Sequence, residues 1–127
     1  MKKVIEKSSP YMFFVFRILV GFMFFMHGAS KLFGWFGGNA QAITSLMGIA
    51  GIVEIVVGIL VFLGLFTQCT ATIGAVYMLM VYFKAHAGNG FNPMANKGEL
   101  ALMYFAAFLV LIKEGAGIWS LDKKLRK

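Results

Sequence analysis

The chain has 127 residues, of which 60% are hydrophobic and only 13% charged, and this composition excludes an ordinary soluble domain. Its formal net charge of +7 would suit a nucleic-acid-binding protein, but no basic face interleaved with aromatic residues and no recognition motif accompanies that charge. We therefore predict a lipid bilayer, and no nucleic acid, as the partner of the basic residues, which gather at the two ends of the chain.

Four apolar stretches separated by polar joints predict four helices, at about residues 10–30, 45–66, 69–87 and 98–114. The stretches are continuous and dotted with glycine, whereas a β-barrel would alternate every second residue. The predicted fold class is all-α, a four-helix transmembrane bundle forming a single domain over residues 1–127. Basic residues precede the first helix and follow the fourth, which predicts cytoplasmic termini and a multi-pass protein of the plasma membrane.

The first predicted helix carries Arg17 in its apolar run and His27 near its outer end, with Lys31 one helical turn later. Gly21 follows Arg17 by one turn, so the two form a notch for a neighbouring helix. The segment 33–38 comes next and contains three aromatic residues and three glycines. It is too apolar to extend into water, and we predict that it lies on the outer surface or folds over the mouth of the bundle, where it would make a lid.

The second predicted helix contains Glu54 in a run that otherwise carries no charge. A carboxylate near the centre of a spanning helix costs a few kcal/mol on insertion scales, so it should have a partner inside the protein. Arg17, equally isolated in sequence, is the predicted partner, at an axial offset of roughly 7–8 Å from the helix midpoints. Such a charge pair could fix helix packing or take part in chemistry directly. Gly51 and Gly58 share the helix face of Glu54 and predict close packing around it.

The third predicted helix begins with the chain's single cysteine, Cys69, so a disulfide within the chain and a Cys-x-x-Cys redox pair are both excluded. Farther along, one stripe of this helix passes through Tyr82 to His86. The predicted topology places His86 at the outer end, as it does His27. Each histidine could take part in a ligand site at that end, or it could simply hydrogen-bond a carbonyl group or a lipid head group. The lower part of the stripe consists of Ala71, Ala75 and Met78.

The fourth predicted helix starts at Asn96-Lys97-Gly98-Glu99, which has the pattern of a capping box. In that interpretation Asn96 is the N-cap and Glu99 is the third helical residue. Glu99 is also an acid at the outer end of the bundle, where a metal bound by His27, His86 and Glu99 is conceivable. These three residues come from separate helices and match no local ligand motif, so we predict no metal site.

Ordered along the chain, these fragments resemble the DoxX family of integral membrane proteins, and the resemblance covers nearly the whole sequence. It implies a small four-helix protein of the plasma membrane, and it links the chain to quinone-dependent redox systems. The fold also resembles vitamin K epoxide reductases, but the paired cysteines of those enzymes are missing here. The fragments are Arg17-Ile-Leu-Val-Gly21, His27-Gly-x-x-Lys31-Leu-Phe-Gly, Glu54 in its glycine-rich helix, Gly64-Leu-Phe-Thr67, His86, Asn92-Pro93, Asn96-x-Gly98-Glu99-Leu and Gly115-x-Gly117-x-Trp119-Ser-Leu-Asp122.

The leading hypothesis is a membrane component of a quinone-linked redox system, with a quinone-like head group held at the outer end of the bundle. Its predicted ligand-binding residues are His27, Lys31, Tyr82 and His86. No flavin or haem motif is present, so we expect no covalently bound cofactor, and a quinone, a redox partner protein or both would supply the chemistry. An oligomer is compatible with this hypothesis.

Two alternatives stay open on the sequence alone. A non-catalytic membrane scaffold would anchor a partner enzyme and would tolerate loss of both histidines. A transporter of a small solute or of protons would line its pathway with intramembrane charges, although four short helices without an internal repeat leave little room for alternating access.

Overall fold

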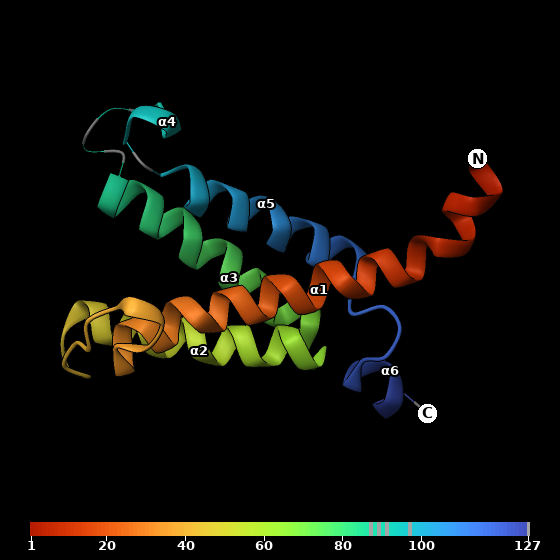
Figure 1. Cartoon of the computed structure of the whole chain (residues 1–127), viewed down its shortest axis with the longest axis horizontal. Helices are drawn as coiled ribbons and strands as arrows, with labels where there is room; N and C mark the ends of the chain where they lie inside the picture. The colour runs from red at the N-terminus through yellow and green to blue at the C-terminus, as the bar shows by residue number, and fades with distance from the viewer. Residues whose placement is uncertain (87, 89, 91, 97, 127) are drawn as a thin grey trace. The chain divides into compact units, whose positions relative to one another are not determined.

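The computed structural model describes residues 1–86, 88, 90, 92–96 and 98–126, and it leaves the side chains of residues 86, 95 and 96 undescribed. The described part of the chain is helical and contains no strand. Four of its helices match the four predicted ones, and the short helices α4 and α6 were not predicted. Figure 1 shows the order of the elements, which are α1 (Lys2–Phe33), η1 (Trp35–Gly37), α2 (Leu46–Leu63), α3 (Thr67–Val81), the π-helical turn η2 (Tyr82–His86), α4 (Pro93–Asn96), α5 (Glu99–Glu114) and α6 (Leu121–Leu125).

The chain divides into two compact units, the first formed by Met1–Thr67 with Ala116–Lys127 and the second by Gln68–Gly115. Helices α1, α2 and α6 belong to the first unit, and α3, α4 and α5 to the second. The prediction of a single domain over residues 1–127 stays a prediction.

In the first unit, α1 and α2 run antiparallel and approach closely through glycines (Figure 1). A Cβ atom on Gly28 would lie 2.6 Å from the carbonyl oxygen of Gly51, and one on Gly58 would lie 2.5 Å from the amide nitrogen of Phe25. No larger side chain fits at such separations, so glycines let the two backbones touch. The close packing predicted around Gly21, Gly51 and Gly58 is confirmed.

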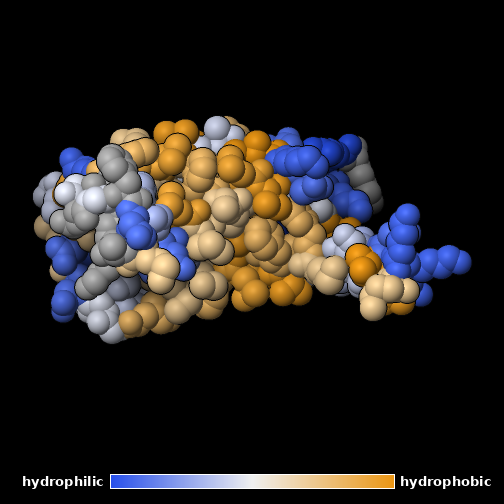
Figure 2. Space-filling view, turned by 90° about the horizontal axis from the view of Figure 1, so that it is seen from above, coloured by the Kyte–Doolittle hydropathy of each residue, from blue (hydrophilic) through white to orange (hydrophobic). Residues whose placement is uncertain are grey.

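Along their apolar stretches, α1 and α2 reverse the surface pattern of soluble helices, because the isolated charged residues lie inside and many large apolar side chains lie outside. The charged residues on the first turns of α1 are exposed. Arg17 and Glu54 are 1% and 2% exposed, whereas Leu19 and Val56 are 51% and 50% exposed. Figure 2 shows apolar side chains over much of the face in view. Helices α1 and α2 are both long and apolar enough to cross a bilayer.

Helix α1 is much longer than predicted. At 32 residues it extends for about 48 Å, against about 30 Å of hydrocarbon in a bilayer. It continues through Pro10 to Lys2, so the basic residues expected to precede the helix lie on its first turns instead. The apolar run alone therefore indicated the membrane-spanning part but not the helical extension into the polar region.

In the second unit, α3 and α5 pack against each other. A Cβ on Gly74 would lie 2.8 Å from the ring of Phe108, and the side-chain amide of Gln68 donates to the carbonyl oxygen of Ile112 at 2.7 Å. The predicted stripe on α3 is buried as far as the structure describes it, through Ala71, Ala75, Met78 and Tyr82. The side chain of His86, which would complete the stripe, lies outside the described residues.

The predicted capping box at the start of the fourth helix is wrong. Helix α5 begins at Glu99 with Gly98 in the N-cap position, and no side chain caps it there. Asn96 instead ends the short helix α4, and its side chain lies outside the described residues. Its helical backbone prevents Asn96 from taking the extended conformation that an N-cap of α5 would need.

Candidate functional site

Glu54 forms an ion pair with Lys31. The Lys31 ammonium donates to both carboxylate oxygens, at 2.7 Å to Oε1 and 2.6 Å to Oε2. Glu54 is almost fully enclosed, while the side chain of Lys31 is 25% exposed. The buried acid of α2 and the more accessible base of α1 thus share a charge-assisted contact between two apolar helices.

The predicted pairing of Glu54 with Arg17 is wrong, because the glycine contacts set a different register between α1 and α2. Gly28 meets Gly51, which places Glu54 near the C-terminal part of α1, within reach of Lys31. Arg17 lies at the level of Phe62, to whose carbonyl oxygen it donates. Eight residues of α2 separate Phe62 from Glu54, or about 12 Å along the helix.

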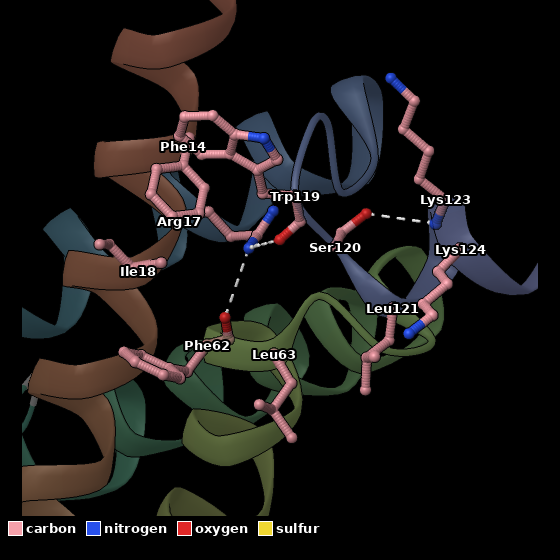
Figure 3. Close-up of a pocket in the computed structure, with 10 residues that line it drawn as sticks. All are labelled: Phe14, Arg17, Ile18, Phe62, Leu63, Trp119, Ser120, Leu121, Lys123 and Lys124. Atoms are coloured by element: carbon pink, nitrogen blue, oxygen red, sulfur yellow. Dashed lines mark hydrogen bonds between the residues drawn. The ribbon is translucent and has the colours of Figure 1, made fainter.

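Arg17 binds backbone oxygens in place of a carboxylate. Its guanidinium donates to the carbonyl groups of Ala116 at 2.6 Å, Ile118 at 3.0 Å and Trp119 at 3.0 Å, and to Phe62 at 3.4 Å. Figure 3 shows its bonds to Phe62 and Trp119, with Phe14 beside it. Arg17 therefore joins α1 to the end of α2 and to the segment after residue 115.

The segment that Arg17 binds has a backbone shaped for this contact. Gly115 and Gly117 have φ values of 77° and 76°, which suit glycine, and Trp119 also adopts the left-handed region at 52°. A non-glycine residue in that region is strained, and its hydrogen bond to Arg17 helps to hold it there. The motif Gly115-x-Gly117-x-Trp119 thus encodes a turn that presents its carbonyl oxygens to a buried cation.

Asp122 completes this end of the first unit. Its carboxylate accepts from the backbone N–H groups of Phe66 at 2.7 Å and Thr67 at 2.9 Å. Burial opposes ionisation of Asp122, but these N–H donors and the charge of Arg126 outweigh it and lower the pKa of the carboxyl group. In the sequence, Asp122 is recognisable only as the last residue of a motif, and no role for it is predicted. Its position close after a glycine-rich turn was the signal in the sequence that could have indicated its structural role.

His27 lines a hollow of about 250 Å³ on the first unit. Its other walls include Met23, Ser30 and Phe36. Phe36 belongs to η1, so this segment supplies one wall of the hollow that His27 lines. That it covers the mouth of the bundle stays a prediction. His27 precedes Lys31 by one helical turn and lies within electrostatic range of both Lys31 and Glu54. Neither Lys31 nor Glu54 lines the hollow, and His27 links the hollow to the ion pair through its electrostatic interaction with both residues.

The other predicted site residues belong to the second unit. Tyr82 is buried and opens the π-helical turn η2, which ends at His86, and Glu99 is an exposed first residue of α5. The structure brings His27, Lys31 and Glu54 together in the first unit. That Tyr82 and His86 meet them stays a prediction, as does the absence of a metal at His27, His86 and Glu99.

The apolar exteriors of α1 and α2, together with the charges enclosed between them, define a helical membrane protein. A family model described as DoxX matches residues 12–87, and the chain belongs to the DoxX family. The match includes the whole of α2 and most of α1, and with them Arg17, His27, Lys31 and Glu54.

Relatives of the chain are themselves described without an activity. It is 42% identical to an uncharacterized protein of Haemophilus influenzae over 97% of each chain. It is 29% identical to an uncharacterized membrane protein of Mycobacterium tuberculosis over 98% of this chain and 88% of the relative. No solved structure matches the chain.

Proposed function

We propose that this DoxX protein is the membrane component of a quinone-linked redox system and that it holds a quinone head group in the hollow beside His27. The observation that carries the proposal is the ion pair of Lys31 and Glu54 within electrostatic range of His27, which lines that hollow. Reduction of a quinone to a quinol takes up two electrons and two protons, and negative charge develops on the ring oxygens. A cation held next to the ring favours that change.

The size and walls of the hollow support a ring-shaped ligand. Its volume of about 250 Å³ is below the roughly 300–1,000 Å³ of sites that enclose drug-sized ligands, so it suits a head group whose tail remains in lipid. Met23 and Phe36 offer polarisable and aromatic contacts, and the imidazole of His27 can hydrogen-bond a quinone oxygen. Tyr82 and His86 are proposed as further contacts of the head group.

In this proposal each charged group has a separate task. The Lys31 ammonium stabilises charge on the ring and carries a proton at Nζ that the Glu54 carboxylate keeps in place. The two electrons come from a reductase partner and the two protons from water, and the protein forms no covalent bond to a cofactor. Association with that partner or with further copies of the chain is part of the proposal.

The proposed setting is the plasma membrane, crossed four times by α1, α2, α3 and α5, with both termini in the cytoplasm. Helix α3 together with η2 covers residues 67–86, which extend for about 30 Å, enough to cross the hydrocarbon region. Helix α5 is shorter, and the proposal requires Lys113 in its last turn to reach the interface by snorkelling.

The test is to purify the protein in lipid nanodiscs made with a known quinone and to quantify the quinone retained per chain by mass spectrometry. We expect His27→Ala and Lys31→Met to lower retention at least tenfold. Lys7→Met removes an exposed lysine of α1 that lines neither cavity and should retain as much quinone as the parent. Helicity measured by circular dichroism confirms that each variant is folded.

Equal retention by the parent and His27→Ala would contradict the site. A folded parent that holds no quinone would contradict the proposed function and would favour the scaffold alternative, in which a partner enzyme co-purifies with the chain whether or not His27 is present.

A further inference from the structure

A second, larger cavity lies at the other charged centre of the first unit, about Arg17. Its volume is about 720 Å³, and its walls come from α1, the end of α2 and the segment 119–124. Much of the lining is apolar, including Phe14, Ile18, Phe62 and Trp119. Figure 3 shows these side chains around the guanidinium of Arg17. The cavity is separate from the hollow beside His27, with which it shares no residue.

The charged groups that line this cavity are all cations, namely Arg17, Lys123 and Lys124. Within the part of the chain that the structure describes, neither lysine forms a salt bridge. The nearby acid, Asp122, uses both carboxylate oxygens to accept from Phe66 and Thr67. Asp122 attracts Arg17 through space, but no acid of the described chain forms a salt bridge with Arg17, Lys123 or Lys124, so the cavity keeps a net positive lining.

Arg17 also lacks a full set of partners. It is 1% exposed, and its two terminal nitrogens donate to carbonyl oxygens, but its Nε has no hydrogen-bond partner among the described residues. Carbonyl dipoles stabilise a guanidinium without cancelling its charge. A buried cation of this kind favours an anion close by.

We propose that this cavity binds an anionic phospholipid, with the phosphate of the head group near Lys123 and Lys124 and an acyl chain along Phe14, Ile18 and Phe62. The cations fit the phosphate, and the aromatic and aliphatic walls fit a hydrocarbon chain. Trp119 is 65% exposed and packs against Tyr11 and Phe14 at ring-centroid distances of 5.5 Å and 4.9 Å. An exposed indole in an aromatic cluster is typical of the head-group level of a bilayer, where phosphates lie.

A free phosphate ion shares the head-group chemistry, but it would leave the apolar walls without a partner. A lipid fits both the cationic and the apolar walls of the cavity. It is independent of the quinone proposal, because it rests on different residues in a different cavity.

Quenching of Trp119 fluorescence by brominated lipids tests the proposal. The full chain with Trp35→Phe has Trp119 as its single tryptophan, since the sequence contains two. It is reconstituted with mixtures of phosphatidylcholine and phosphatidylglycerol, either of which carries the bromine. The ratio of the two quenching constants gives the preference for the anionic lipid at Trp119.

The expected result is a clear preference for phosphatidylglycerol that falls about tenfold in Lys123→Gln/Lys124→Gln. The control is Lys2→Gln/Lys3→Gln, which removes the same charge from the start of α1 and should keep the preference. None of the four lysines contributes a carbonyl group to Arg17, so both double variants should fold. Circular dichroism checks this.

Three results would overturn the proposal. The first is an absence of preference in the parent protein, and the second is an equal loss in the two double variants, which would mean general surface attraction. In a third arm, inorganic phosphate is added against sodium chloride of equal ionic strength. Relief of quenching by phosphate alone would mean that the cavity recognises a free anion and not a lipid.

Discussion

Arg17 shows how a charged side chain can be kept inside an apolar bundle without a carboxylate. Its guanidinium is planar and presents donors in two directions, so the terminal nitrogens reach the carbonyl groups of Phe62, Ala116, Ile118 and Trp119. Each of these oxygens is presented by a turn or a helix end, where backbone acceptors are free. The charge is solvated by backbone dipoles in the way that water would solvate it.

We predict that Arg17→Lys destabilises the protein by about 2 kcal/mol, because one ammonium nitrogen cannot reach four oxygens that surround a fork-shaped group. The free energy of unfolding in mixed micelles, measured by titration with sodium dodecyl sulfate, gives the value. Arg126→Lys changes an exposed arginine near the C-terminus and should leave the stability unaltered. Equal stability of the Arg17→Lys and Arg126→Lys variants would contradict the role given to Arg17.

Asp122 predicts a dependence of stability on pH. Its pKa in the folded protein is below the ordinary aspartate value of about 3.9, so its contribution is fully present above that value and is lost as the pH falls through the folded pKa. We expect Asp122→Asn to unfold more readily than the parent at pH 7 and the difference to shrink as the pH approaches 3.

Thermal unfolding in detergent at several pH values provides that measurement. Glu6→Gln, which removes an exposed acid near the start of α1, serves as the control and should show no such trend. A difference between the parent and Asp122→Asn that stays constant from pH 7 to pH 3 would rule out the ionised carboxylate as its source.

The pairing of α1 with α2 depends on glycine more than on charge. A Cβ on Gly21 would overlap the backbone at Phe62, and Gly28 and Gly58 meet backbone atoms in the same way. These contacts fix the register, and the register in turn decides that Glu54 meets Lys31. The ion pair is a consequence of the helix packing.

We predict that Gly21→Ala destabilises the α1–α2 pair by about 1–3 kcal/mol, since an added methyl group forces two backbones apart. In an open helix the same change would stabilise by about 0.5–1 kcal/mol, so the overlap decides the sign. Gly88→Ala places its Cβ in open space and is the matched control. Unfolding by sodium dodecyl sulfate measures both, and a Gly21→Ala protein as stable as the control would refute the prediction.

The sequence was a good guide to these elements where a repeating pattern encoded them. Apolar runs predicted α1, α2, α3 and α5, and small residues on one face predicted the glycine notch at Gly21, Gly51 and Gly58. It failed at Arg17, because backbone carbonyl groups are its partners and every residue has one. It failed again at Asn96, which was predicted to cap α5. Asn96 ends the short helix α4, which is too short to produce a hydrophobic periodicity in the sequence.

The arrangement of the chain in the membrane can be tested directly. In a Cys69→Ser background we expect Asn39→Cys, between α1 and α2, to react with a membrane-impermeant maleimide in intact cells. Arg126→Cys should react only after the membrane is opened, as cytoplasmic termini require. Labelling of Arg126→Cys in intact cells would contradict the four-span topology.

The bond between Arg17 and the carbonyl group of Ala116 spans 99 positions of the chain, and this separation has a consequence for biosynthesis. A ribosome adding roughly 5–20 residues per second leaves a nascent chain waiting about 5–20 s between making Arg17 and making its acceptors. Until then the cation has only Phe62 to bind. A chain that stops before residue 116 leaves Arg17 with Phe62 alone of its four carbonyl acceptors, so a truncated copy holds a poorly solvated charge within its apolar helices.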